Sequence, residues 1–433
     1  MTSKNVAQAE GILRFPLEEK QFVFSYKKVV IMKKTLAAVA VLGAFAGSAL
    51  AADVTLYGKV DLGLQYMNTN TDQLVVNEDI VGTQNVKKDS WGMKSGSNSG
   101  SRFGLKGAEQ ISDDLTVGFQ LEQGFTADDG KLGADGLAFN REARLYVQTA
   151  FGEIGLGRMG GLDSGLGSYD IISKGYVFGT GWGSTIADSS AILLGESSRF
   201  DNMITYKSPT FAGVTVLAQA SLAKTSVEEG EGSSDVDRYY AIGATGNWGA
   251  LSSALTFSTT DYARTWVNDD KNGEDGREDM SKVLTGFVAY DFGMVKPMLV
   301  AQYFDDLKGM SVSSTLEESF EDVVNAWGAG LSDLSKKGYG VMLGATAPVG
   351  AGTLYAVVGY NDYESTVSFE EDGKIEADTV QFGIGYQYPL SKRTYVYTAA
   401  GYTKASTDFK ENGKKYDLET KTTEVVAGIV HNF

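Results

Sequence analysis

The 433-residue chain has no cysteine, one histidine and five prolines. Without cysteine it can form neither disulfides nor thiolate metal sites, and it has no cysteine nucleophile. A single histidine leaves little room for histidine-based catalysis or a zinc site. No stretch reaches the roughly 20 apolar residues of a transmembrane helix, although membrane barrels lack such runs as well. We therefore expect no enzyme, no catalytic residue, no metal site and no cofactor.

Charge and apolar content narrow the class further. The formal charge is −17, so the chain would repel nucleic-acid phosphates, and we expect no nucleic-acid partner. Apolar residues make up 42% of the chain, which is enough for a folded protein and excludes wholesale disorder. The sequence is thus that of a folded, acidic protein.

The segment 32–51 has the three parts of an export signal. Lys33 and Lys34 are its positive start, 36–46 is its apolar centre, and Ala49-Leu50-Ala51 is a small-residue cleavage site. Residues 1–31 precede it as an upstream extension that carries Glu10, Glu18 and Glu19, and we interpret this extension as a mis-assigned translation start. Because the segment removed holds seven Lys and Arg against three Asp and Glu, the mature chain 52–433 would carry a charge of −21.

Long alternating runs dominate the mature chain. Residues 54–66 place apolar side chains on one face and polar ones on the other, because side chains in a strand change face at every residue. Sixteen such runs follow one another, joined alternately by short turns and long loops. This regular order predicts an all-β fold, a 16-stranded antiparallel transmembrane β-barrel with turns on one rim and loops on the other.

Acidic residues are concentrated in the long loops, as in "NDDKNGEDGRED" (268–279). A solvated loop surface explains this pattern. The acids and glycines of 268–279 depart from the EF-hand spacing, so a calcium loop is the less favoured interpretation. Loop-bound divalent cations that bridge to lipopolysaccharide phosphates are a further possibility that the sequence leaves open.

Parity identifies charges that point into the barrel. The apolar face of a membrane barrel meets lipid and the polar face lines the interior, so four cations on strands 1, 2, 4 and 6 are predicted to face the lumen: Lys59, Arg102, Arg144 and Arg199. The alternative is that neighbouring acids neutralise these cations and that they serve no functional arrangement.

The third long connection, 159–198, is rich in glycine and apolar residues and its charge is mostly acidic. A connection of this length is usually functional or disordered, and its aromatic content argues against disorder. Folded into the barrel, it would narrow the pore and place carboxylates opposite the cations. The candidates are Asp163, Asp170, Asp188 and Glu196.

Two features lie where this connection begins. Glycines 155, 157 and 160 match a dinucleotide-binding fingerprint, but no helical pattern follows them, so we reject the match. Arg158 has the parity of the outward Ile154 and Leu156, where an arginine would meet lipid. A subunit interface would accommodate it, so Arg158 is a candidate interface residue.

Several stretches together resemble the general trimeric porins of the Gram-negative outer membrane, especially the betaproteobacterial branch. They are "VTLYGKVDLGLQY" at 54–66, "SRFGLKGAEQI" at 101–111, "FGEIGLGR" at 151–158, "SRFDNMITYKSPTFAGV" at 198–214 and "VVAGIVHNF" at 425–433. The resemblance covers essentially all of 52–433.

The resemblance implies a homotrimer in outer-membrane lipid and lipopolysaccharide, with loop 3 inside each barrel and passive diffusion of ions and small hydrophilic solutes. The four lumen cations match the basic wall of the family, and Asp170, Asp188 and Glu196 are candidates for its acidic loop. Phe433, with His431 and Ile429 at alternating positions, resembles the signal that the barrel-assembly machinery reads.

Other functions remain to be weighed against a diffusion channel. A barrel enzyme would need a nucleophile with a base in reach, and His431 lies at the opposite rim from the long loops. An adhesin or partner-binding barrel, and a substrate-specific channel, are the remaining alternatives. Because the acidic loops should raise cation entry, the sequence favours a preference for cations.

Overall fold

The computed structural model describes residues 54–433, except 78–79, 135, 184, 187–188, 196–197, 226–235, 264–278, 309–334, 367–373 and 412–413. The predicted extension 1–31, the signal segment 32–51, the calcium-loop candidate 268–279 in all but its last residue, and the candidates Asp188 and Glu196 lie outside the described residues. Among the described residues, no helix is long and apolar enough to cross a membrane.

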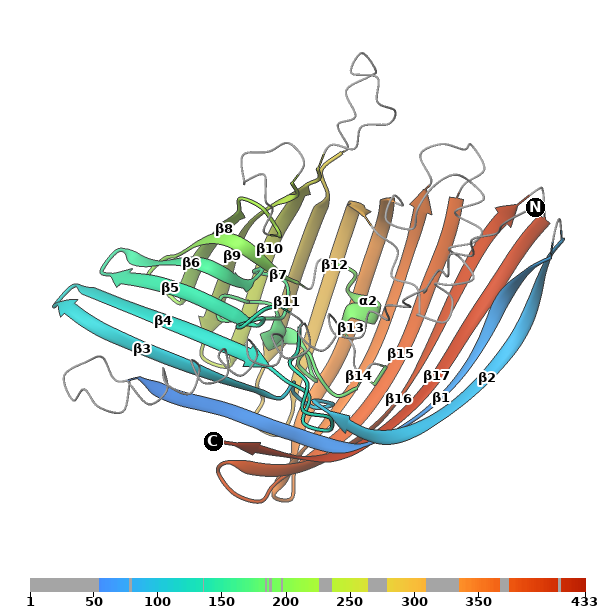
Figure 1. Ribbon diagram of the computed structural model, residues 1–433, viewed down its shortest axis with the longest axis horizontal. Coiled ribbons are helices and arrows are strands. Elements are labelled where there is room, and N and C mark those ends of the chain that lie inside the picture. The colour runs from blue at the N-terminus through green and yellow to red at the C-terminus, as the bar shows by residue number, and fades with distance from the viewer. Residues whose placement is uncertain are drawn as a thin grey trace, which may run out of the picture. The chain divides into compact units, whose positions relative to one another are not determined.

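The described residues form seventeen strands and two short helical turns (Figure 1). The first nine strands are β1 Thr55–Asn77, β2 Ile80–Ser95, β3 Arg102–Ser112, β4 Leu115–Gly124, β5 Glu142–Thr149, β6 Gly152–Gly160, β7 Arg199–Lys207, β8 Val214–Ser221 and β9 Arg238–Trp248. The others are β10 Leu251–Asp261, β11 Lys282–Tyr290, β12 Lys296–Lys308, β13 Ser335–Val349, β14 Gly352–Thr366, β15 Lys374–Pro389, β16 Thr394–Glu411 and β17 Lys414–Asn432. The turns are η2 Ser173–Gly175 and α2 Ser189–Ile192.

Strand pairing closes the sheet into a barrel. Strands β3 to β17 pair antiparallel in chain order, and β17 pairs with β1. The other edge of β1 takes β3 at 55–59 and β2 at 62–77. Because β2 and β3 share this edge, they occupy one position, and the ring is the closed 16-stranded antiparallel barrel that the alternation predicts.

The first long connection is more ordered than the sequence predicts. By the alternation alone, the first long loop spans about residues 69–98, but β1 continues to Asn77 and β2 returns along it as a hairpin. Between β2 and β3, the six residues 96–101 interrupt the pairing with β1; we call them the strand insert. The sequence GSNSGS is polar and rich in glycine, which is typical of a loop. The residues on either side of it form strands.

As the alternation predicts, apolar side chains cover the outer surface of the strands. On β14, Val358 and Tyr360 are exposed, whereas the intervening Gly359 and Asn361 face the interior. Large apolar side chains are exposed in the same way along many strands, as expected for a lipid-facing band. The pattern therefore positions one wall against lipid and leaves the other to build the interior.

One segment departs from simple parity. Alternation with Arg199 and Asp201 places Phe200 on the outer face of β7, yet Phe200 is buried and packs against Tyr239, with ring centroids 4.6 Å apart and ring planes tilted by 34°. Asn202, two residues further on, has a positive φ of 54°. The register between β6 and β7 also shifts at Gly157/Met159, so the face that each side chain takes changes within the strand.

The described residues of loop 3 (161–198) lie inside the ring, where Figure 1 shows α2 beside the inner wall. Asn361 donates to the carbonyl of Ala191 at 2.7 Å, and Gln381 donates to the carbonyl of Thr185 at 2.9 Å. Thr185 N–H donates to Glu424 Oε2 at 2.7 Å. Hydrogen bonds from β14, β15 and β17 thus hold the loop across the lumen.

Loop 3 also forms an apolar core with the wall. Its contributors include Ile172, Phe178, Trp182, Ile186 and Ile192, all buried. They pack with inward residues of the wall, and on β11 to β17 these include Phe287, Val300, Met342, Val357 and Val426. We call this the apolar side of the lumen.

Candidate functional site: the lumen cavity

A cavity of about 670 Å³, which we call the lumen cavity, lies between loop 3, the strand insert, a charged stretch of the wall, and Gln387 and Tyr395 of β15 and β16. Its charged lining comes from β3, β4, β7 and the start of β5, and consists of Arg102, Glu122, Arg141, Glu142 and Arg199. The insert contributes Gly96, Asn98, Ser99 and Gly100. We call this charged wall the basic side of the lumen.

Loop 3 contributes backbone and uncharged side chains to this cavity. The described lining residues of the loop are 165–168, Ser173 and 178–182, a stretch rich in glycine. Glycines allow the loop backbone to approach the pore closely, because no side chain intervenes. The described loop residues therefore add polar backbone groups but no carboxylate to the cavity lining.

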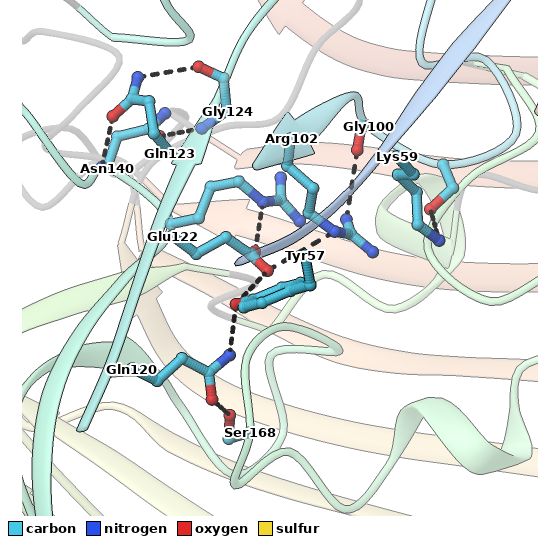
Figure 2. Close-up of polar contacts among 12 residues, drawn as sticks. Tyr57, Lys59, Gly100, Arg102, Gln120, Glu122, Gln123, Gly124, Asn140 and Ser168 are labelled. Atoms are coloured by element: carbon cyan, nitrogen blue, oxygen red, sulfur yellow. Dashed lines mark hydrogen bonds and ion pairs between the residues drawn. The ribbon is translucent and has the colours of Figure 1, made fainter. Parts of the chain in front are cut away.

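Glu122 joins two arginines at the centre of the basic side (Figure 2). Its Oε1 lies 2.7 Å from Arg141 Nε and its Oε2 lies 3.7 Å from Arg102 Nε. Tyr57 OH donates to the same Oε2 at 3.1 Å, and Gln120 donates to Tyr57 OH at 2.9 Å. One carboxylate thus serves two guanidinium groups, which leaves excess positive charge beside the cavity.

Arg144 is held differently from the other predicted cations. Its Nε lies 2.9 Å from Glu142 Oε1, and its Nη1 donates to Glu153 at 3.2 Å. Its guanidinium also lies 4.7 Å from the ring centre of Tyr146 and 4.8 Å from that of Tyr169. Two carboxylates and two aromatic rings therefore fix Arg144, and it is not among the residues that line the cavity.

The other predicted cations lie nearer the pore. Arg102 and Arg199 line the cavity, and Lys59 Nζ donates to Ser99 Oγ of the insert at 3.2 Å. Arg141 and Glu122 were not among the residues expected from the sequence. Glu122 has the inward parity of Gln120, so a signal for it existed, but Arg141 precedes β5, where parity carries no information.

The two described loop 3 candidates bind protein groups. Asp163 accepts from Tyr239 OH at 2.8 Å and from Ser258 Oγ at 2.6 Å, which ties the loop to β9 and β10. Asp170 accepts backbone N–H groups of Gly165, at 2.9 Å, and of Ser173, at 3.1 Å, and burial raises the pKa of its carboxyl. Neither lines the cavity, and their role at a constriction stays a prediction.

Comparison with known proteins identifies the family. A family model described as Gram-negative porin matches residues 37–408. The chain belongs to this family. An outer membrane porin protein of Bordetella pertussis is 31% identical over 416 residues, which cover 93% of this chain and 100% of that one.

Solved porin structures share the fold. The anion-selective porin from Comamonas acidovorans has a TM-score of 0.56 and 22% identity, covering 88% of this chain and 100% of that chain. In vitro folded OmpT of Vibrio cholerae, in its trimer form, has a TM-score of 0.54 and 16% identity, with 88% and 100% covered. The protein is an outer-membrane porin, a channel for passive diffusion.

The interface candidate Arg158 has partners within the porin chain. Its Nη1 lies 2.5 Å from Asp201 Oδ1, and its Nε donates to the carbonyl of Asn140 at 3.0 Å. These contacts satisfy the guanidinium without a second subunit. Its predicted role at a subunit interface stays a prediction.

The end of the porin chain closes the ring. Phe433 N–H donates to the Gly58 carbonyl at 3.0 Å, and Gly58 N–H donates to the Phe433 carbonyl at 3.2 Å. His431 Nδ1 lies 2.9 Å from Thr394 Oγ1. Ile429 and Phe433 are exposed, and the role of these three residues as an assembly signal stays a prediction.

Metal ligation can be assessed for the described part of the chain. There, no group of three or more His, Cys, Asp or Glu side chains is arranged to hold a metal ion. The possibility of loop-bound divalent cations therefore rests on loop residues outside the described ranges.

Proposed function

We propose that the lumen cavity is the constriction of this porin and that it favours anions over cations. The observation that carries the proposal is the charge of the described lining, in which three arginines face two glutamates. At close quarters, charged side chains that line a pore decide which ions enter it. The Comamonas acidovorans porin is described as anion-selective, which supports the same direction.

This proposal replaces the preference for cations that the sequence favours. That expectation weighs the whole mature chain, whose acids are concentrated in the long loops. Interactions between exposed charges separated by more than about 8–10 Å are largely screened at physiological salt. The lining of the narrow cavity therefore outweighs the distant loops.

Reversal potentials in a salt gradient across a planar bilayer test the proposal. We expect an anion-favouring potential for the porin, and a shift toward cations when Arg102 and Arg141 are both changed to alanine. Arg393→Ala is the matched control, because it removes an arginine at the exposed turn between β15 and β16. A cation-favouring potential of the unchanged porin would overturn the proposal.

We also propose that the porin works as a homotrimer, which the trimer form of OmpT supports. The expected readout is channel closure in three equal conductance steps in the same recordings. Single, independent steps from purified protein of monomer mass would contradict it.

A further inference from the structure

The strand insert is a larger interruption than a β-bulge. Ser95 pairs with Leu62 and Arg102 pairs with Lys59, so two residues of β1, Val60 and Asp61, lie opposite six residues of the insert. A bulge ordinarily adds one residue to one strand. The insert therefore leaves the wall, and four of its six residues line the lumen cavity.

Asp61 binds the insert through both its backbone and its side chain. Its carbonyl accepts from Gly96 N–H at 3.1 Å, and its N–H donates to Ser101 Oγ at 3.0 Å, which fixes the two ends of the insert. Its carboxylate Oδ2 accepts from the N–H groups of Asn98, at 2.7 Å, and Ser99, at 2.8 Å. The side chain is fully buried, where charge-assisted hydrogen bonds of this kind are strong.

Two tyrosines of β16 complete the support. Tyr397 OH donates to Asp61 Oδ1 at 2.8 Å, and Tyr395 OH donates to Asn98 Oδ1 at 2.8 Å. Strand β16 is separated from β1 by β17, so these contacts reach across the inside of the barrel. Asp61 thereby ties the insert to two parts of the wall.

The insert in turn holds loop 3. The Ser97 carbonyl accepts from the N–H groups of both Trp182 and Gly183, the latter at 2.7 Å. A Cβ on Gly181 would lie 1.7 Å from the Asn98 carbonyl oxygen, so the approach requires glycine there. Trp182 has a positive φ of 79°, a conformation that persists in a non-glycine residue only where its surroundings impose it.

Two residues of the insert, Ser99 and Gly100, also bind cations. Lys59 donates to Ser99 Oγ, and Arg102 Nη1 donates to the Gly100 carbonyl at 3.3 Å (Figure 2). The insert therefore lies between the cations and loop 3 and touches both. Its position determines how far the loop stands from the arginines.

We propose that Asp61 is a positioning residue of the channel, which fixes the strand insert and through it the distance of loop 3 from the basic side. The inference rests on the proposed function in that it takes the lumen cavity to be the conducting path. It assigns a role to a carboxylate that contacts the pore only through other residues.

The absence of native cysteine makes the test direct. A single cysteine in place of Thr180, which lines the cavity, reports access to the loop through its labelling rate with a methanethiosulfonate reagent. In the Asp61→Ala background we expect labelling to become about tenfold faster or more, the effect of losing a hydrogen bond to a charged group. Single-channel conductance should rise as well.

Asp61→Asn is the conservative variant, because its amide oxygen still accepts the two N–H groups and its NH₂ can donate to Tyr397 OH. We expect its labelling rate and conductance to stay near those of the unchanged porin. Asp89→Ala removes an exposed carboxylate of the same hairpin and serves as the control. If Asp61→Ala does not fold, Tyr397→Phe replaces it: a smaller increase supports the proposal, and no change overturns it.

The same recordings separate this inference from the proposed function. If Asp61→Ala matches the unchanged porin in labelling and conductance while the reversal potential favours anions, the positioning role is overturned alone. Equal loosening by alanine and asparagine would support the positioning role and assign it to the charge of the Asp61 carboxylate, since asparagine keeps hydrogen-bonding groups but not the charge. A cation-favouring unchanged porin would overturn the proposed function itself.

Discussion

On the basic side of the lumen, β3, β4 and β5 present Arg102, Glu122 and Glu142 to the interior, whereas on the apolar side β11 and β14 present Phe287 and Val357. The strands differ too: β4 to β8 have 8 to 10 residues, and β13 to β17 have 15 to 19 (Figure 1).

The difference shows that a side chain that points into the barrel does not always line the cavity. Where the wall meets the cavity, its inward residues are charged and paired. Where loop 3 covers the wall, the same strand geometry supplies a packed apolar core. The lumen cavity thus lies beside the arginines, where loop 3 leaves space between itself and the wall.

A charge placed on the apolar side should cause the largest loss of stability. Val357→Asp buries a carboxylate against loop 3 without a partner, which costs about 3–5 kcal/mol of unfolding free energy. Urea unfolding followed by heat-modified gel mobility measures the loss. Gln120→Glu places the same charge beside Arg144 on the basic side and should change stability by less than about 1 kcal/mol. Equal losses would remove the distinction between the two sides.

Truncating the loop 3 core should come next. Trp182 is buried and packs edge-on against Phe178, at 5.3 Å, and Tyr397, at 5.4 Å. Trp182→Ala should cost about 3–4 kcal/mol and make loop 3 sensitive to added protease. Trp91→Ala is the control, since Trp91 is 84% exposed. An equally protease-resistant Trp182→Ala barrel would show that the core does not hold the loop.

A methyl group between loop and wall should have a smaller effect. A Cβ on Gly340 would lie 2.0 Å from the Ile192 carbonyl oxygen, so Gly340→Ala must push loop 3 away from β13. We expect a loss of about 1–3 kcal/mol and an altered single-channel conductance. Gly92→Ala, where a Cβ meets no atom within 4 Å, should leave both unchanged. Unaltered conductance in Gly340→Ala would mean that the close approach does not position the loop.

The smallest effect on stability is expected in the exposed loop that follows β4, the strand that carries Glu122. Hydrogen bonds from Lys131 and Thr126 lower the pKa of the Asp129 carboxyl to about 2. Because the folded pKa is depressed, the stabilisation of this turn is fully present above about pH 4 and is lost as pH falls through about 2. Emission of a dye on Leu132→Cys should follow this transition, and Asp129→Asn should abolish it. A transition that persists in Asp129→Asn would assign it to another group.

Much of this fold follows from the sequence because period-two alternation is enforced by lipid on one face. The seven short turns and the closing pair of first and last strands needed no further information. The inward cations Arg102 and Arg199 follow from the same rule, since charge on the lipid face costs a few kcal/mol.

The rest depends on contacts that alternation does not encode. Phe200 turns inward because a register shift and a positive φ at Asn202 alter the strand locally. The acids of loop 3 looked like pore groups, yet Asp163 is used to anchor the loop to Tyr239 and Ser258. The sequence of the strand insert is typical of a loop. Only the pairing of β2 and β3 with the same edge of β1 shows that the insert interrupts one strand of the ring.

The reciprocal hydrogen bonds between Gly58 and Phe433 join opposite ends of the chain. Closure therefore carries a large loop-closure entropy, because the paired residues are 375 positions apart in the sequence. A nascent barrel that lacks β17 would expose two unpaired strand edges, which are templates for aggregation. Pairing of β17 with β1 hides both edges, so the seam removes this hazard from the folded barrel.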